Sequence, residues 1–175
     1  MPTKGTLPRG WPTACDVEYI SHQCYAKGIP SSIVEHLRGW HPLTSTTPCP
    51  LVQIRRITAQ HHPAHGQCGL FAARKIAAKA HILDYFGEVH IDLREGSDYD
   101  LSLVKLRATD FPDAKIESDW ISVGIDAVRR GNEARFVNDY RGISETPNTV
   151  FQERVVDGQL RIGVFAGSRS ISKNR

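Results

Sequence analysis

The segment GNEARFVNDYRGISETPN, residues 131–148, combines apolar anchors with polar side chains in a way that ordinary surface loops do not. An apolar pair beginning at Phe136 stands directly before an Asn-Asp-Tyr-Arg cluster, and the segment then turns at Gly142 and closes with Pro147-Asn148. Surface loops are usually built from glycine, serine and asparagine alone. The pattern therefore predicts a backbone that is held inside a site.

The composition around this segment is that of one globular domain. The chain has 175 residues, of which 40% are hydrophobic and 23% are charged, so it can form one core but not two comfortable ones. Its formal charge is only +3, and pairs such as Arg55-Arg56 and Arg129-Arg130 do not make a dense basic run along the chain. The sequence predicts no specific DNA binding on this ground.

The four cysteines, Cys15, Cys24, Cys49 and Cys68, form no CxxC pair and have no histidine at zinc-finger spacing. They predict free thiols in a reducing compartment and neither a disulfide framework nor a metal site. No apolar run approaches 18 residues, and the N-terminus lacks a basic-then-apolar signal sequence. We expect a soluble intracellular protein that makes no membrane contact.

The first fifty residues hold seven of the ten prolines, which predicts a loop-rich region. One short helix is expected in PSSIVEHLRG, where Ser32 stands three residues before Glu35 as a capping box. Ile33 and Leu37 are four apart, so they share a face, and Gly39 is a typical helix end. We expect this helix to pack as a lid or brace on the domain that follows.

From residue 51 onward the pattern changes to short strands rich in β-branched and aromatic residues. The hairpin turn Asp157-Gly158, which favours a two-residue type I′ loop, joins the last two strands. In the second of these strands, apolar residues around Ile162 occupy every other position, which predicts that one face of the strand is buried. We divide the chain into a Pro-rich region, 1–50, and a domain, 51–175. Strands are expected at residues 51–58, 81–90, 99–104, 120–128, 149–156 and 159–166.

Two polar clusters are candidates for a catalytic or metal site. His61, His62 and His65 lie in a Pro-containing loop without the carboxylate partners that tune metal-binding histidines, so we expect no metal there. Asp98 and Asp100 are two apart on a strand, and edge carboxylates explain them more simply than an acid pair. The chain has no GxGxxG, P-loop, HExxH or GxSxG motif.

CGLFAARKIAAKAHILDYFGEV, residues 68–89, is similar to a block of the SET-domain family of protein lysine methyltransferases, GxGLFA followed by YxGEV. Gly69 matches the second glycine, while Gln67 stands in place of the first. RFVNDYRG...PN, within residues 131–148, resembles the family's RFINHSC.PN block, and the two blocks come in the family's order. The resemblance covers about residues 51–175. It implies a mostly β fold with short helices, which is β-clip-like, has several small sheets and carries a threaded, knot-like C-terminal segment.

The resemblance also implies a site for the methyl donor S-adenosylmethionine. Asn138 matches the asparagine that holds the polar end of the cofactor, while Asp139 replaces a histidine and Tyr140 replaces a serine or cysteine. An acid at this position can change the electrostatics around the cofactor, although a main-chain contact survives the replacement. The cofactor-binding residues implied are Gly69, Leu70, Phe71, Arg135, Phe136, Asn138 and Asp139, and no metal is implied.

Two aromatic residues correspond to walls of the family's lysine channel. Tyr85 matches the tyrosine before Gly-Glu, and Phe151 stands where some relatives carry tyrosine. An apolar, aromatic channel disfavours the ammonium form of lysine, and aromatic faces hold a cationic product. Each aromatic taken alone is more simply a core residue. The resemblance gives Tyr85 and Phe151 catalytic roles.

After the segment VFAGSRSISKNR, SET domains continue with a strand that carries the main catalytic tyrosine, so the match is C-terminally incomplete. The short N-terminal region is more similar to small fungal, single-domain members than to multidomain ones. The leading hypothesis is a nuclear lysine methyltransferase that acts on a histone, and non-histone or ribosomal substrates stay open. The rival is a catalytically impaired SET module that binds a protein or peptide.

Overall fold

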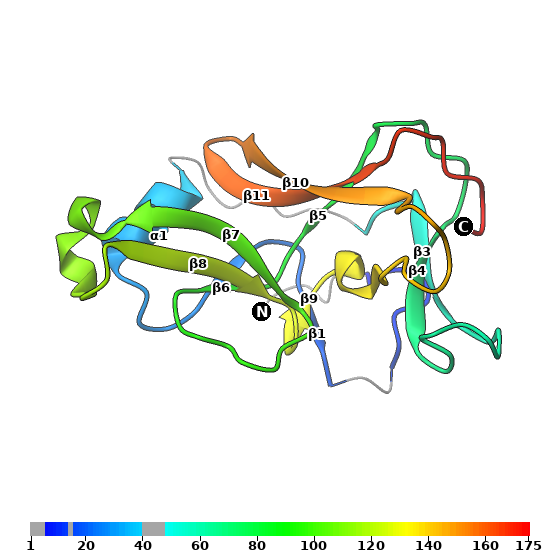
Figure 1. Cartoon of the computed structure of the whole chain (residues 1–175), viewed down its shortest axis with the longest axis horizontal. Helices are drawn as coiled ribbons and strands as arrows, with labels where there is room; N and C mark the ends of the chain where they lie inside the picture. Colours follow the sequence, from blue (N-terminus) through cyan, green and yellow to red (C-terminus); the bar gives the residue numbers. More distant parts are fainter. Residues whose placement is uncertain (1–5, 14–15, 40–47) are drawn as a thin grey trace.

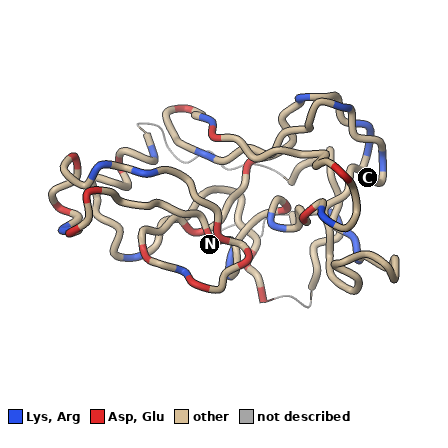
Figure 2. Tube along the Cα trace, in the orientation of Figure 1, with Lys and Arg blue, Asp and Glu red and all other residues tan. Residues whose placement is uncertain are grey.

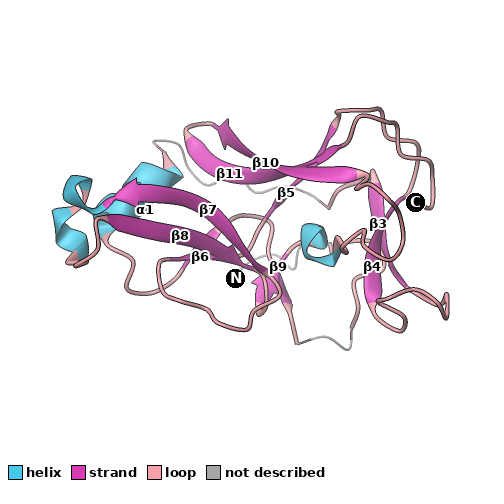
Figure 3. Cartoon of the chain, viewed as in Figure 1, coloured by secondary structure: helices cyan, strands magenta, loops and turns pink. Residues whose placement is uncertain are grey.

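The computed structural model describes residues 6–13, 16–39 and 48–175. Within these ranges the chain is mostly β, with strands in four small sheets, one α-helix and three short 3-10 helices (Figure 3). The expectation of a mostly β fold with short helices and several small sheets is confirmed. The threaded C-terminal segment and the boundary at residue 50 stay predictions. Among the described residues, no helix is long and apolar enough to cross a membrane.

The largest hairpin forms as its turn residues predict. Strand β10 (Thr149–Val156) pairs antiparallel with β11 (Gln159–Ala166), which pairs in turn with β5 (His81–Tyr85). Asp157 and Gly158 both have positive φ, 50° and 77°, as a type I′ turn requires. In Figure 1 this sheet runs along the top of the molecule.

Strand β11 departs from the prediction because both of its faces are buried. Ile162 and Val164 pack in the core, but Arg161 is also only 3% exposed. Its guanidinium donates to Asp84 Oδ2 at 2.9 Å, and Arg154 donates to Oδ1 of the same carboxylate at 2.9 Å. A buried charge is tolerated when it is paired in this way, so simple apolar alternation does not identify the second buried face.

A four-stranded sheet has the order β2-β6-β8-β7 and supplies much of the core. β2 (Cys24–Tyr25) pairs parallel with β6 (Glu88–His90), and β8 (Trp120–Asp126) pairs antiparallel with β6 and with β7 (Asp100–Arg107). A bulge interrupts β7 between Ser102 and Val104. The inner faces of these strands are apolar. Fully buried members include Val89, Leu103, Ile121, Val123 and Ile125.

Two further pairs complete the strands. β3 (Val52–Arg56) pairs antiparallel with β4 (Cys68–Ala72), and β1 (Glu18–Tyr19) pairs parallel with β9 (Arg130–Gly131). The 3-10 helix η3 (Glu133–Phe136) contacts β3, β4 and β5, so it lies between the sheets (Figure 1). The segment of residues 131–148 therefore begins inside the fold. The other 3-10 helices, η1 (Ala108–Asp110) and η2 (Pro112–Ala114), follow β7.

Helix α1 (Ser31–Arg38) forms where predicted and ends at Gly39, whose φ is 71°. Ile33 and Leu37 are fully buried, and the helix packs against β11, as expected of a brace. The predicted capping box is wrong, because Pro30 is the N-cap and Ser32 already lies inside the helix. The Ser32 hydroxyl instead donates to the carboxylate of Asp113, which anchors the helix to η2.

Cys24, Cys49 and Cys68 are free, as predicted, and Cys15 lies outside the described residues. Cys24 and Cys49 are partly buried, and desolvation raises the pKa of both thiols above the ordinary value of 9.0. A raised pKa keeps a thiol protonated and unreactive.

Candidate functional site

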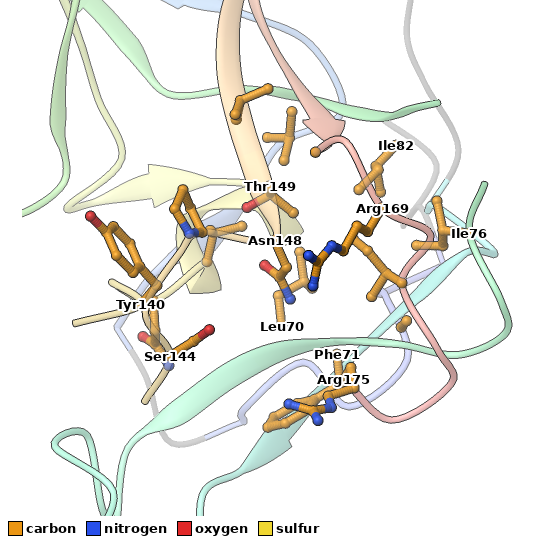
Figure 4. A pocket seen from close by; sticks show the side chains of 18 of the residues that line it. Leu70, Phe71, Ile76, Ile82, Tyr140, Ser144, Asn148, Thr149, Arg169 and Arg175 are labelled. Atoms are coloured by element: carbon orange, nitrogen blue, oxygen red, sulfur yellow. The ribbon is translucent and has the colours of Figure 1, made fainter. Parts of the chain in front are cut away.

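A pocket of about 820 Å³ lies where three stretches of the chain meet. One wall is strand β4, the second is the irregular segment after η3, and the third is the stretch that follows β11 (Figure 4). Its lining combines apolar side chains with amide, hydroxyl and charged groups. Lining residues include Leu70, Phe71, Ile76, Ile82, Asn138, Asp139, Tyr140, Asn148, Thr149, Val164, Arg169 and Arg175.

The two sequence blocks meet at this pocket through Gly69 and Asn138. A Cβ atom built on Gly69 would lie 2.9 Å from Asn138 Nδ2 and 3.1 Å from Ile57 Cδ1. A side chain at Gly69 would therefore displace the Asn138 amide, which lines the pocket. Leu70 and Phe71 continue the same wall. A role of Gly69 toward the cofactor stays a prediction.

Three residues of the predicted cofactor set, Gly69, Arg135 and Phe136, are not among those that line the pocket. Arg135 donates from Nε to the Ala127 carbonyl at 2.9 Å, and its guanidinium stacks 4.1 Å from the centre of the Tyr99 ring. Phe136 is buried, and its ring meets Trp11 edge-on at 5.5 Å. Both contacts fix η3 in place, which orients the backbone that leads into Asn138.

The predicted channel aromatics lie close to each other on one face of the β10-β11-β5 sheet. The rings of Tyr85 and Phe151 meet edge-on with centroids 6.0 Å apart. Phe151 is 40% exposed, and its strand partner Val164 lines the pocket. The aromatic pair is therefore next to the pocket wall rather than inside the pocket.

Tyr85 is buried, and its hydroxyl donates to the Tyr99 carbonyl at 2.6 Å. Burial raises the pKa of Tyr85 well above its ordinary value of 10.0, and the carbonyl already holds its proton. The Tyr85 side chain thus stays neutral at physiological pH. Its role in the structure is a fixed, uncharged aromatic wall.

The segment after Asn138 is shaped by a local ion pair. Asp139 accepts from the Arg141 backbone N–H at 3.0 Å and from its guanidinium at 2.6 Å. These bonds hold the pKa of Asp139 below its ordinary value, so the carboxylate at the pocket rim stays charged. The Tyr140 carbonyl accepts from Ile143 and Ser144 at 3.0 Å, which closes the turn.

The histidine loop between β3 and β4 reaches the same rim. Pro63 packs against Gly142, where an added Cβ would lie 2.8 Å from Pro63 Cγ, and His62 lines the pocket. His62 Nδ1 accepts the Ala64 backbone N–H at 3.0 Å, while His65 bonds the Ala59 carbonyl at 3.1 Å. In the described part of the chain, no three His, Cys, Asp or Glu side chains are grouped to hold a metal ion.

Sequence reasoning missed the third wall of the pocket. Residues 167–175 follow β11 without any periodic apolar pattern, so nothing in the local sequence marks Arg169 or Arg175 as pocket residues. Several backbone hydrogen bonds hold this stretch, among them a bridge in which Ile171 and Ile76 exchange hydrogen bonds of 2.9 Å. Both isoleucines are buried. An apolar residue at each of these two positions is the only weak indication of this contact in the sequence.

No family profile matches the chain. The histone-lysine N-methyltransferases ASHH3 and ASHR3 of Arabidopsis thaliana are each 35% identical to it, over 105 and 103 residues. These matches cover 60% and 58% of the chain but 26% and 19% of the relatives, so the chain spans about a quarter or less of their length.

Solved structures of ATXR5 share the fold. A crystal structure of ATXR5 in complex with a methylated histone H3.1 superimposes with a TM-score of 0.62, at 18% identity. The match covers 90% of this chain and 77% of that one. A structure of the ATXR5 SET domain with a methylated histone H3 gives a TM-score of 0.61. These likenesses confirm the fold that the two sequence blocks implied.

Proposed function

We propose that this chain, a SET-domain fold related to the histone-lysine methyltransferases, is part of a protein lysine N-methyltransferase that uses S-adenosylmethionine. The observation that carries the proposal is the Gly69–Asn138 contact beside the pocket. It joins the two blocks that sequence resemblance assigned to the cofactor, and it leaves the asparagine amide on the pocket wall.

The pocket residues suit the chemical groups of this methyl donor. The volume of the pocket is that of small-molecule sites, and its lining offers apolar side chains for a ring system together with a few polar groups. Asn138 would hold polar atoms of the amino-acid end. Arg169 offers a cation for a carboxylate, and Asp139 offers a carboxylate for an ammonium group.

When bound, the donor supplies an electrophilic methyl group on a sulfonium. The work left to the protein is alignment and the exclusion of water around the reacting amine. Tyr85 and Phe151 provide aromatic faces beside the pocket wall, where a lysine amine is favoured in its neutral form. The fixed Tyr85 hydroxyl adds no charge, so this wall does not oppose loss of the lysine proton.

The test is methyl incorporation from labelled S-adenosylmethionine into histones, located by mass spectrometry, with donor affinity measured in parallel by calorimetry. Asn138→Ala should weaken donor binding at least tenfold, or about 1.4 kcal/mol. Gln152→Ala removes an amide from the exposed strand β10, outside the pocket, and serves as the matched control. Absence of donor binding by the unmodified chain overturns the proposal.

A histone lysine is the substrate that we propose, because the related plant enzymes are named for it and the ATXR5 complexes contain histone H3. A nuclear location follows from the same proposal. Comparing isolated histones with ribosomal proteins in the methylation assay separates the two substrate classes. Methyl transfer to ribosomal proteins but not to histones would show that the substrate is a ribosomal protein.

One observation favours a second candidate, a binding module without transfer. The Tyr85 hydroxyl is occupied by the Tyr99 carbonyl, so this tyrosine offers no free hydroxyl to a substrate amine. A module of this kind would bind S-adenosylmethionine and a histone peptide but transfer no methyl group. Donor binding without label incorporation, under conditions where a related enzyme is active, would establish it.

A further inference from the structure

Two stretches that are far apart in the sequence run side by side near the C-terminus. Residues 73–80 follow β4, and residues 167–175 follow β11. The Ile76–Ile171 bridge joins them, and Lys79 N–H donates to the Gly167 carbonyl at 3.0 Å. The Ala72 N–H donates to the Arg175 carbonyl at 2.8 Å, which fixes the other end. The two stretches therefore form one rigid ribbon.

This ribbon, called the basic ridge below, carries six exposed cations and no acidic residue. Among the described residues, no salt bridge involves any of the six. The whole chain has a formal charge of only +3, so the rest of the molecule is net negative. Figure 2 shows the blue segments gathered near the C-terminus. The six cations are Arg74, Lys75, Lys79, Arg169, Lys173 and Arg175.

The other side chains of the ridge indicate what kind of polyanion fits it. Ile76 and Ile171 are buried, and the exposed apolar side chains of the ridge are alanines only, so the ridge exposes no apolar anchor for a membrane or an apolar peptide. The ridge has no aromatic residue on which unpaired bases could stack. Exposed serines alternate with the cations in the second stretch, at Ser168, Ser170 and Ser172.

We propose that the basic ridge binds the phosphate backbone of double-stranded DNA without reading its sequence. Lysine, arginine and serine side chains are the usual partners of DNA phosphates, and they carry no base specificity there. The sequence shows no basic run because the two stretches contribute three cations each and meet only in the fold. The inference does not depend on methyl transfer.

The ridge also forms one edge of the pocket, because Arg169 and Arg175 line both features. DNA held on the ridge would lie beside the pocket mouth. A protein substrate that is itself bound to DNA would then be brought to the site by its DNA.

The experiment is fluorescence anisotropy with the full chain and two labelled 20-base-pair duplexes of unrelated sequence. A triple charge reversal, Lys75→Glu, Lys79→Glu and Lys173→Glu, avoids every pocket-lining residue. The matched control reverses Lys27, Lys105 and Lys115, which are exposed elsewhere. Each triple contains one lysine with positive φ, Lys79 or Lys115, so the backbone cost is matched.

The unmodified chain should bind both duplexes equally. Contacts to four to six phosphates predict a slope of log affinity against log salt of about −4 to −5. The ridge triple should weaken binding at least ~30-fold, against at most about twofold for the control. A milder triple to glutamine should fall between these values, and thermal unfolding checks that all variants are folded.

The proposal is overturned if the two triple variants lose equal affinity for duplex DNA, if affinity does not depend on salt concentration, or if the chain does not bind duplex DNA at low salt. So does tighter binding of poly-glutamate or of anionic lipid vesicles than of duplex DNA, which would assign the ridge to an acidic protein or to a membrane. Tighter binding of single-stranded DNA would likewise contradict a backbone-only duplex site.

Discussion

At the scale of single residues, Gly69 is the position where the smallest change should have the largest effect on the pocket. Gly69→Ala would place a methyl group 2.9 Å from Asn138 Nδ2 and 3.1 Å from Ile57 Cδ1. Because its φ is not in the left-handed region, the cost is one of space, about 1–3 kcal/mol of stability. We expect affinity for S-adenosylmethionine, measured by calorimetry, to fall at least tenfold.

A double-mutant cycle shows whether Gly69→Ala weakens donor binding through Asn138. If Gly69→Ala acts by displacing the Asn138 amide, then Asn138→Ala and the double variant should bind the donor equally weakly. Additive losses from the two single changes would show that Gly69 acts on the pocket independently of Asn138.

Glu133 gives a residue-scale prediction about pH. This side chain on η3 is 3% exposed, and desolvation raises its pKa above the ordinary value of 4.5, although its Oε1 accepts the Cys49 N–H at 2.7 Å. A carboxyl group whose pKa is higher in the folded state binds protons more tightly there. Its contribution to stability is therefore lost as pH rises from 4.5 through the raised pKa.

Glu133→Gln keeps an acceptor for Cys49 but removes this titration. As the pH rises from about 4.5 to 7.5, the unmodified chain should lose stability that the variant keeps, about 1.4 kcal/mol for a pKa that is one pH unit higher in the folded state. Urea unfolding at several pH values measures it. The control is Glu153→Gln, because Glu153 is exposed. Gln159→Ala is not a suitable control, because it removes the buried hydrogen bond that Gln159 accepts from Arg161. A pH-independent difference between Glu133→Gln and the unmodified chain would contradict the prediction.

At the scale of elements, sequence patterns succeeded where local chemistry dictates geometry. Asp157-Gly158 fixed a hairpin because both residues tolerate positive φ, and Gly39 ended α1 for the same reason. The sequence patterns failed where a residue far away in the sequence determines the contact. Ser32 bonds Asp113 instead of capping its own helix, and Arg161 is buried because Asp84 neutralises it. Neither partner can be found from spacing along the chain.

The brace role of α1 predicts a large cost for truncating its buried face. Leu37 is fully buried against the core, so Leu37→Ala should lower the free energy of unfolding by about 2–5 kcal/mol, the sum of lost burial and a cavity. Leu93→Ala is the matched control, because Leu93 is 82% exposed and should change stability by less than about 0.5 kcal/mol. Similar losses in the two variants would mean that α1 is not part of the cooperative core.

At the scale of the whole molecule, the sequence predicted which blocks matter but not the surface they build. Asn138, Asp139, Leu70 and Phe71 line the pocket, and their binding of the cofactor stays a prediction. Arg135 and Phe136, from the same block, lie behind it, because a linear motif does not distinguish contact residues from those that position them. The pocket edge formed by residues 167–175 and the basic ridge arise only when separate stretches meet.

The first fifty residues provide the last prediction, because their elements complete sheets that belong to the rest of the chain. β1 pairs with β9, β2 pairs with β6, and α1 packs on β11. A fragment of residues 51–175 would expose the core face that Ile33 and Leu37 cover and would leave two strand edges unpaired. We expect this fragment to show no cooperative thermal transition by circular dichroism, whereas residues 6–175, which keep every described element, should melt within about 5 °C of the full chain. If the fragment melts cooperatively near the temperature of the full chain, the boundary at residue 50 separates an independent domain, and the pairing of β1 and β2 contributes little to stability.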